Sequence, residues 1–263
     1  MDSAPAAVGL AAGAVLWEVA ARIWNQPFFP PFSAVVVRLG QLTTEGKILG
    51  ALVGSLTNLA IGFTISAVIG VGLGILMGAY RKVEMALDVY VYALLTAPSL
   101  VFAPIFFAVF GLGRASILGV IIVYALFIII VNTTAAIRGV SPPLIEMGRS
   151  FCASERQLFV KIILPAALPL IFAGLRLGMG RAVKGTINGE MFISAVGLGA
   201  VVISAGRRFD AAAVLAVLLV IIVVALVAIK LVQLVDARMT GWLPSTARQG
   251  RPSGALRRAR AMQ

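Results

Sequence analysis

Four long stretches without a charged residue constrain this chain more than any other feature. They run over Ile48–Tyr80, Val89–Gly113, Ala115–Ile137 and Ala211–Ile229. A helix needs roughly 20 apolar residues to cross the hydrocarbon core of a bilayer, and each stretch is about that long or longer. The whole chain is 60% hydrophobic and only 12% charged, which is too few charges for the surface of a soluble domain. The stretches therefore predict membrane-spanning helices.

Two weaker candidates complete the count. The segment 4–24 is apolar but carries Glu18 and Arg22; it lacks a basic start and a small-residue cleavage site, so we expect a retained span rather than a signal peptide. The segment 169–193 is long enough to span but contains several charges. We predict an all-α polytopic membrane protein with six transmembrane helices, near residues 4–24, 52–80, 86–110, 116–137, 169–193 and 211–235.

The net charge of +12 is distributed as a membrane topology requires. With both termini in the cytoplasm, most basic residues fall on the cytoplasmic side, including the Arg-rich segment at the end of the chain, as the positive-inside rule demands. That segment would contact anionic lipid. A nucleic-acid partner is not expected, because no aromatic residues alternate with the bases. The chain has no histidine and one cysteine, so neither a metal site nor a cofactor is expected.

The second predicted span carries small or short polar residues at every fourth position. On a helix this spacing forms a ridge along which a second helix can approach closely, as small-residue patterns do inside membranes. The ridge consists of Gly54, Asn58, Gly62, Ser66, Gly70, Gly74 and Gly78.

Two prolines, Pro98 and Pro104, lie inside the third predicted span. Proline in a membrane helix leaves backbone carbonyls that neighbouring helices or a water-lined cavity must satisfy, so we expect a kink. The kink could line a pathway or only fit its neighbours.

A polar segment of roughly 138–169 interrupts the apolar chain between the fourth and fifth spans. Ser141 followed by two prolines suits a helix start. A small break at Cys152–Ser154 would separate two short helices, and proline at position 165 would end the second, since proline disfavours helix in the residue before it. The pattern predicts a two-helix knob outside the membrane; an ordinary loop would fit its length equally well.

The spacing within this segment resembles the signature loop of the membrane subunits of binding-protein-dependent ABC importers. That loop reads Glu-Ala-Ala, three residues, Gly, nine residues, Ile-x-Leu-Pro. Here Glu146 takes the first position, Met147 and Gly148 replace the alanines, and Cys152 replaces the glycine. The matching loop residues are Glu146, Met147, Gly148, Cys152, Ala153, Ser154, Ile162, Leu164 and Pro165.

From about 46 to 242 the chain is also similar to the sulfonate, nitrate and taurine branch of these permeases, through "APSLVFAPIFFAVFGLGRAS" and "LRLGMGRAVKGTINGEM" among others. The resemblance implies the type I importer permease fold, with loop helices that dock on two separate ATPase subunits. It also implies a second permease copy, an extracytoplasmic substrate-binding protein, and a location in the bacterial inner membrane. No ATP-binding Gly-Lys-Ser/Thr loop occurs in the chain, so ATP hydrolysis is expected in the partner.

Charged and polar residues on the fifth span are candidates for a pathway, because charges inside a membrane are costly. Arg181, Lys184 and Asn188 share one helix face and suit an anionic cargo; Glu190 follows two residues later. The alternative is structural: Arg181 could pair with a helix end, and Glu190 could pair across a subunit interface. The resemblance favours that alternative for Arg181 and Glu190.

Three regions follow: residues 1–46, an N-terminal span with an outer connector; 47–236, the permease core; and 237–263, a basic cytoplasmic tail. The predicted function is the transmembrane subunit of an ATP-driven importer of a small, anionic solute. A secondary transporter or channel independent of an ATPase is the alternative. The sequence shows no chain of intramembrane acids and no inverted repeat that would favour it.

Overall fold

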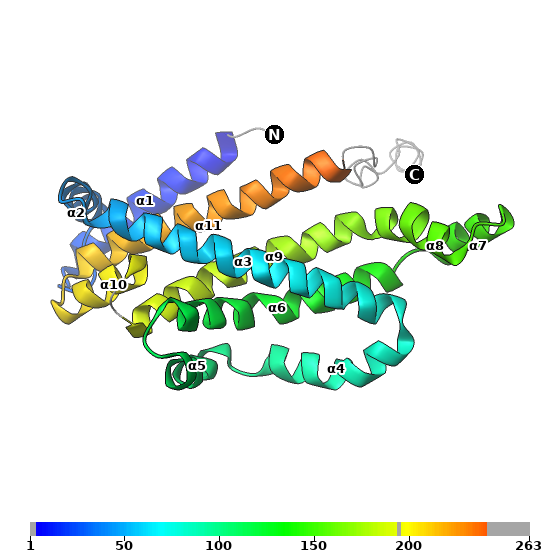
Figure 1. Cartoon of the computed structure of the whole chain (residues 1–263). Coiled ribbons are helices and arrows are strands. Elements are labelled where there is room, and N and C mark those ends of the chain that lie inside the picture. The colour runs from blue at the N-terminus through cyan, green and yellow to red at the C-terminus, as the bar shows by residue number, and fades with distance from the viewer. Residues whose placement is uncertain (1–3, 194–195, 241–263) are drawn as a thin grey trace, which may run out of the picture.

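A computed structural model describes residues 4–193 and 196–240, and within these ranges the chain is helical with no strand. The long helices lie roughly along one axis (Figure 1). One end of the bundle carries α2 and α10, and the opposite end carries the protruding α7 and α8. The elements are α1 (Ala4–Trp24), α2 (Phe32–Thr44), α3 (Lys47–Ala79), α4 (Arg81–Thr96), η1 (Ser99–Val101), α5 (Phe102–Phe110), α6 (Arg114–Arg138), α7 (Pro142–Ser150), α8 (Glu155–Leu158), η2 (Phe159–Ile163), α9 (Leu164–Ile193), α10 (Gly197–Arg207) and α11 (Ala211–Thr240).

The small-residue ridge of α3 packs against α6, which confirms the close approach predicted from its spacing. A Cβ added at Gly62, Gly70, Gly74 or Gly78 would overlap the side chain of an α6 residue. The respective partners are Ile121, Ile129, Thr133 and Ile137. Each partner lies 59 positions after its glycine (121 − 62, 129 − 70, 133 − 74 and 137 − 78). The two helices therefore run parallel and in one register.

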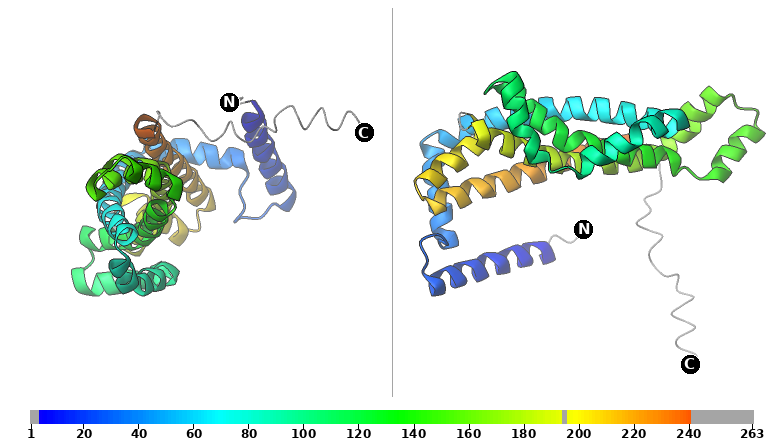
Figure 2. Two further views of the ribbon diagram at one scale, coloured as in Figure 1. Left: turned by 90° about the vertical axis from the view of Figure 1, so that its right-hand side faces the viewer. Right: turned by 90° about the horizontal axis from the view of Figure 1, so that it is seen from below.

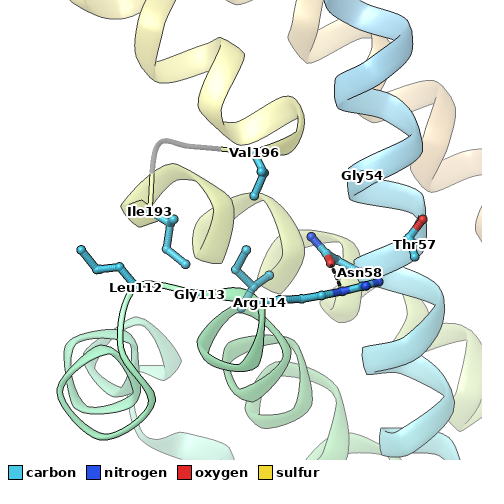
Figure 3. Close-up of a pocket in the computed structure, with 9 residues that line it drawn as sticks. Gly54, Thr57, Asn58, Leu112, Gly113, Arg114, Ile193 and Val196 are labelled. Atoms are coloured by element: carbon cyan, nitrogen blue, oxygen red, sulfur yellow. Dashed lines mark hydrogen bonds between the residues drawn. The ribbon is translucent and has the colours of Figure 1, made fainter.

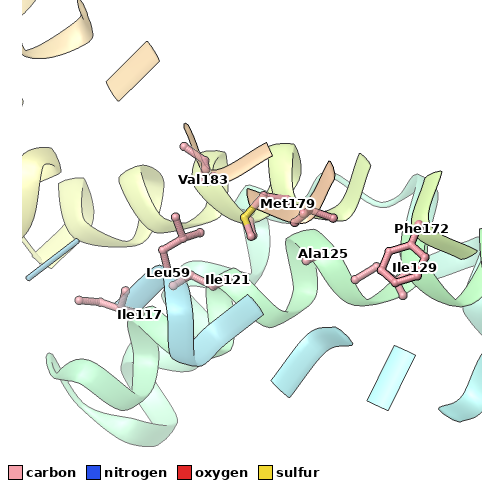
Figure 4. Packing of buried hydrophobic residues seen from close by; sticks show 11 residues of the cluster. Leu59, Ile117, Ile121, Ala125, Ile129, Phe172, Met179 and Val183 are labelled. Atoms are coloured by element: carbon pink, nitrogen blue, oxygen red, sulfur yellow. The ribbon is translucent and has the colours of Figure 1, made fainter. Parts of the chain in front are cut away.

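α9 presents a second stripe of glycines to α6. A Cβ at Gly174 would meet Asn132, at Gly178 it would meet Ile129, and at Gly189 it would contact Ile117. Partner numbers fall as the glycine numbers rise, so α9 runs antiparallel to α6. Bulky α6 side chains thus fill the space that glycine leaves on both neighbours. Figure 4 shows the resulting core, formed by Leu59, Ile117, Ile121, Ala125, Ile129, Phe172, Met179, Ala182, Val183, Ala228 and Val232.

A second core lies at the α2 and α10 end. Val35 and Leu42 from α2 pack there with Leu198 from α10 and Val217 from α11. α1 stands apart from the bundle in both views of Figure 2. It is joined to the start of α2 by hydrogen bonds from Trp17 to the Pro30 carbonyl (3.1 Å) and from Ser33 to Glu18.

The third predicted span, near 86–110, is sharply bent beside Pro98, where a kink was expected, and consists of two separate helices. α4 ends at Thr96, and the η1–α5 segment leaves it at an angle of 89°. Pro98 lies in the break, where its ring keeps the preceding residue out of the helical region; Ala97 has ψ 141°. Pro104 lies in the first turn of α5, where a helix has no backbone hydrogen bond for proline to remove.

Within the described residues, four helices are long and apolar enough to span a membrane: α3, α6, the continuous helix 155–193 and α11. The bent α4–α5 pair would make a fifth. The chain is thus a multi-pass membrane protein, as predicted. α1 forms at the predicted residues but is not among these spans, so six spans stay a prediction. The predicted basic tail lies outside the described residues beyond 240.

Candidate functional site

The predicted two-helix segment forms and protrudes from one end of the bundle (Figure 1). α7 ends in a Schellman motif: the Cys152 N–H donates to the Arg149 carbonyl (2.8 Å), and the Ala153 N–H donates to the Gly148 carbonyl (3.2 Å). Cys152 therefore occupies the C′ position of this motif, with φ at 55°. Glycine is usual there because the left-handed conformation carries no Cβ penalty for glycine. This geometry gives a physical reason for a glycine at that position of the signature loop.

Ser154 starts the second helix with a capping box. Its hydroxyl accepts from the Gln157 N–H (3.4 Å), and the Gln157 side chain accepts from the Ser154 N–H (2.9 Å). This helix does not end at Leu164–Pro165, contrary to the prediction. It continues through the π-helical η2 into α9, and the Leu164 N–H bonds back to the Phe159 carbonyl. This hydrogen bond joins residues five apart and so shifts the backbone hydrogen-bond pattern of the helix immediately before Pro165. Because Pro165 has no N–H to contribute, the shifted pattern accommodates it, and the helix continues to Ile193.

The two arms of the segment pack on each other through Gly148. A Cβ there would lie 2.5 Å from the Ile162 side chain and 3.5 Å from Leu158. The outer surface carries Glu146 together with apolar side chains: Phe151 is 80% exposed and Met147 49%. Large apolar side chains exposed on a protruding segment are typical of a surface that meets another protein.

On α9, the polar face that the sequence predicted is only partly engaged. Arg181 and Lys184 are exposed, and neither forms an ion pair within the described part of the chain. Asn188 donates to the Tyr124 hydroxyl on α6 (2.8 Å). Arg176 differs, because it pairs with Asp236 on α11 (3.0 Å). Two cations thus lie on the surface of a long apolar helix, Arg181 close to its middle.

Glu190 is fully buried within its own chain, so the prediction that it lines a pathway or pairs across a subunit interface is corrected. Its carboxylate accepts from the Ser55 hydroxyl (2.7 Å), from the Asn58 side chain (3.3 Å) and from the Gly199 N–H (3.2 Å). The start of α10 supplies that N–H, and a helix N-terminus favours a carboxylate. Gly197, with φ at 81°, leaves the space for this carboxylate, since a Cβ there would overlap it. Glu190 therefore fastens α3, α9 and α10 together.

Arg114 extends this cluster to a cavity at the α2 and α10 end. Its Nε donates to the Asn58 side-chain oxygen (3.0 Å), while the amide nitrogen of the same Asn58 donates to Glu190. Figure 3 shows Arg114 and Asn58 meeting at the wall of a cavity of about 360 Å³. The cavity lining is Gly54, Thr57, Asn58, Leu112, Gly113, Arg114, Ile117, Ile193 and Val196.

Sequence reasoning counted Arg114 only as a topological charge. One signal could have singled it out: it is the sole charged residue between Asp88 and Arg138. Asn58 was assigned to the small-residue ridge, although its amide also links two charged groups. These two groups, the Arg114 guanidinium and the Glu190 carboxylate, lie 56 and 132 residues after Asn58 in the sequence, so only the folded chain brings them together. Across residues 4–193 and 196–240, no cluster of three or more metal-binding side chains occurs.

Comparison with known proteins gives consistent matches. Residues 70–241 match the family described as binding-protein-dependent transport system inner membrane component. A putative ABC transporter permease protein of Methanocaldococcus jannaschii is 34% identical over 198 residues, which are 73% of this chain and 74% of that protein. The putative aliphatic sulfonates transport permease protein SsuC of Bacillus subtilis is 33% identical, covering 72% of this chain and 70% of its own. The nitrate import permease protein NrtB of Synechocystis is 38% identical over 55% of this chain and 53% of its own.

Proposed function

This chain belongs to the family of binding-protein-dependent transport system inner membrane components, and we propose on that premise that it is the transmembrane subunit of an ATP-driven importer of a small anion. A separate ATPase would bind the segment 146–165. The observation that carries this proposal is the protruding segment itself. Apolar side chains are exposed outside the bundle on α7, and α7 packs on a helix that continues without a break into the middle of the bundle.

The continuous helix 155–193 supports a mechanical role for this segment. A force applied to α8 would be transmitted along η2 into α9, because no loop separates them. α7 is fixed to the same helix through Gly148 and Ile162. ATP-driven closure of a partner could therefore move α9 as a rigid element.

The cargo side of the proposal rests on α9. With α7 and α8 in the cytoplasm, Lys184 lies nine residues before the other end of α9, roughly 14 Å at the usual helical rise. Arg181 lies about one turn deeper. A cation in that position needs a counter-charge or a water-filled path. We assign Lys184, with Arg181 and Asn188, to a pathway enclosed by two copies of this chain. The names of the relatives, which include sulfonate and nitrate permeases, agree with an anionic cargo.

Co-purification tests the ATPase contact directly. The chain is expressed together with a candidate ABC ATPase subunit of the same organism, and the two are captured through the permease. We expect Glu146→Lys to reduce the recovered ATPase on the order of tenfold, since charge reversal at a docking surface opposes the partner. Glu45→Lys is the matched control, because Glu45 is an acid at the opposite end of the bundle. Equal recovery with both variants, or no ATPase with the wild type, would contradict the proposal and favour an ATPase-independent transporter.

A further inference from the structure

Arg114 is a cation at a cavity, and no acidic partner for it lies within the described part of the chain. Its single hydrogen bond within the described residues is to the neutral Asn58 side chain through Nε. The two terminal nitrogens of the guanidinium are left for another acceptor. Because a guanidinium binds carboxylate and sulfonate oxygens through paired N–H groups, the vacant donors suit an oxyanion.

The buried cluster beneath the cavity fixes where this guanidinium points. The Glu190 carboxylate accepts from Asn58, so the amide nitrogen of Asn58 faces inward and its oxygen faces Arg114. The Glu190 carboxylate also accepts hydrogen bonds from Ser55 and from Gly199 at the start of α10. Asn58 separates the two charges, and Arg114 forms no direct ion pair with the buried acid. Its positive charge is therefore available at the cavity wall.

The rest of the cavity is apolar. Leu112, Ile117, Ile193 and Val196 line it, and the hydroxyl of Thr57 and the backbone of Gly113 add polar atoms. Figure 3 shows Leu112, Ile193 and Val196 on the side of the cavity away from Asn58. A volume of about 360 Å³ holds a molecule of several heavy atoms, at the small end of ligand sites.

We propose that this cavity is a binding site for a small organic monoanion, with the oxyanion headgroup on Arg114 and a short apolar tail against Leu112, Ile193 and Val196. One guanidinium balances one negative charge, which selects a monoanion over a dianion. The site lies at the opposite end of the bundle from α7 and α8, and it is separate from Lys184 on α9. The inference rests on the proposed function only for the direction from which the anion arrives.

Binding to the full-length chain in phosphatidylcholine nanodiscs tests the site without any transport step. Sodium butane-1-sulfonate is the probe, butan-1-ol is the uncharged control, and calorimetry gives the Kd. We expect saturable binding of the sulfonate and none of the alcohol. Arg114→Gln should raise the Kd on the order of tenfold or more, as for loss of a charge-assisted hydrogen bond. Arg208→Gln, which removes a charge at the same end outside the cavity lining, should leave the Kd within about twofold.

A cavity-filling variant and a change of lipid complete the test. If Arg114→Gln does not fold, Val196→Trp fills the cavity and leaves Arg114 in place, and it should abolish binding. In nanodiscs that contain phosphatidylglycerol, unchanged sulfonate binding supports a site for soluble anions, whereas loss of binding shows a lipid headgroup site and overturns the proposal. No wild-type binding, or equal weakening by Arg114→Gln and Arg208→Gln, also overturns it. If the chain binds the sulfonate but recovers no ATPase in the co-purification, the proposed function is contradicted and the proposed binding site is not.

Discussion

At the scale of single residues, Cys152 and Glu190 show how local geometry sets what a position can hold. Cys152 closes α7 in the left-handed region, a conformation that costs residues with a Cβ roughly 1–2 kcal/mol. The Glu190 carboxylate on α9 accepts hydrogen bonds from three donors on two other helices, α3 and α10. Cys152 departs from the signature loop, which has glycine at this position. Glu190 is an acidic residue whose hydrogen-bond partners all lie within the same chain.

Replacing Cys152 by glycine should therefore stabilise the turn between α7 and α8. We expect a gain of roughly 0.5–1 kcal/mol, after deducting the greater freedom of glycine in the unfolded chain. Amide hydrogen exchange at residues 153–158 measures it as slower local opening, and uptake should be kept or improved. Cys152→Val should act in the opposite direction, because a β-branched side chain suits this conformation least. Lost uptake in Cys152→Gly, with slower exchange at the turn, would count against docking through this segment.

At the scale of helices, α6 is held between two glycine stripes, one on α3 and one on α9. Inside a membrane, apolar area alone does not drive association, so contact distance matters more than hydrophobicity. The stripes let the α6 side chains reach the backbone of both neighbours. A hydrogen bond from Thr134 to the Gly74 carbonyl (3.2 Å) reinforces the α3–α6 contact.

Two glycines on α3, Gly72 and Gly74, allow the effect of close helix packing on stability to be measured separately from the effect of helix propensity. A Cβ at Gly74 would lie 2.5 Å from the Thr133 Cβ and 2.8 Å from the Ile130 carbonyl, whereas a Cβ at Gly72 would have nothing within 4 Å. Gly74→Ala should destabilise the chain by roughly 1–3 kcal/mol through overpacking. Gly72→Ala should be neutral or stabilise by up to about 1 kcal/mol through helix propensity. Thermal unfolding in nanodiscs compares the two. Similar midpoints for both variants would show that the ridge is not a tight contact.

The sequence predicted these contacts well where they depend on spacing, and poorly where they depend on distant partners. The ridge from Gly62 to Gly78 and the helix start at Ser141 follow local rules, and both form. The helix end predicted at Pro165 was wrong, because a π-helical turn before it accommodates the missing N–H of the proline. Arg114 was missed because its position depends on Asn58 and, through it, on Glu190, from three separate helices. Tertiary hydrogen bonds of this kind leave no periodic pattern in a sequence.

At the scale of the whole molecule, the features with proposed roles are arranged along the bundle axis. The protruding segment 142–163 occupies one end, the cavity of Arg114 the other, and Lys184 lies between them on α9. α9 contributes to all three: it continues the segment, carries Lys184 and places Ile193 in the cavity. An arrangement of this kind suits a protein that passes a solute along its axis under the control of a partner at one end.

Lys184→Met tests the middle of this arrangement. If Lys184 contacts an anionic cargo, uptake should fall on the order of tenfold, the loss expected for a hydrogen bond to a charged group, while the assembled complex remains intact. Lys82→Met removes a lysine near the end of the bundle that carries α7 and should leave uptake unchanged. Unchanged uptake in Lys184→Met would exclude cargo contact. Loss of the second permease copy in the same variant, measured by size and mass in solution, would assign Lys184 to the subunit interface.

The constant offset of 59 between the contacting residues of α3 and α6 has a mechanical consequence. Side chains that interlock at every fourth position resist sliding of α3 along α6. The next equivalent register is four residues away, or about 6 Å along the axis. Small axial displacements between these helices are therefore blocked, and the glycine stripe of α9 interlocks with α6 in the same way. The helices α3, α6 and α9 would move as one rigid body. Bending during a transport cycle would then concentrate where these interlocked contacts are missing, at the break beside Pro98 and where α9 extends beyond α6 toward η2.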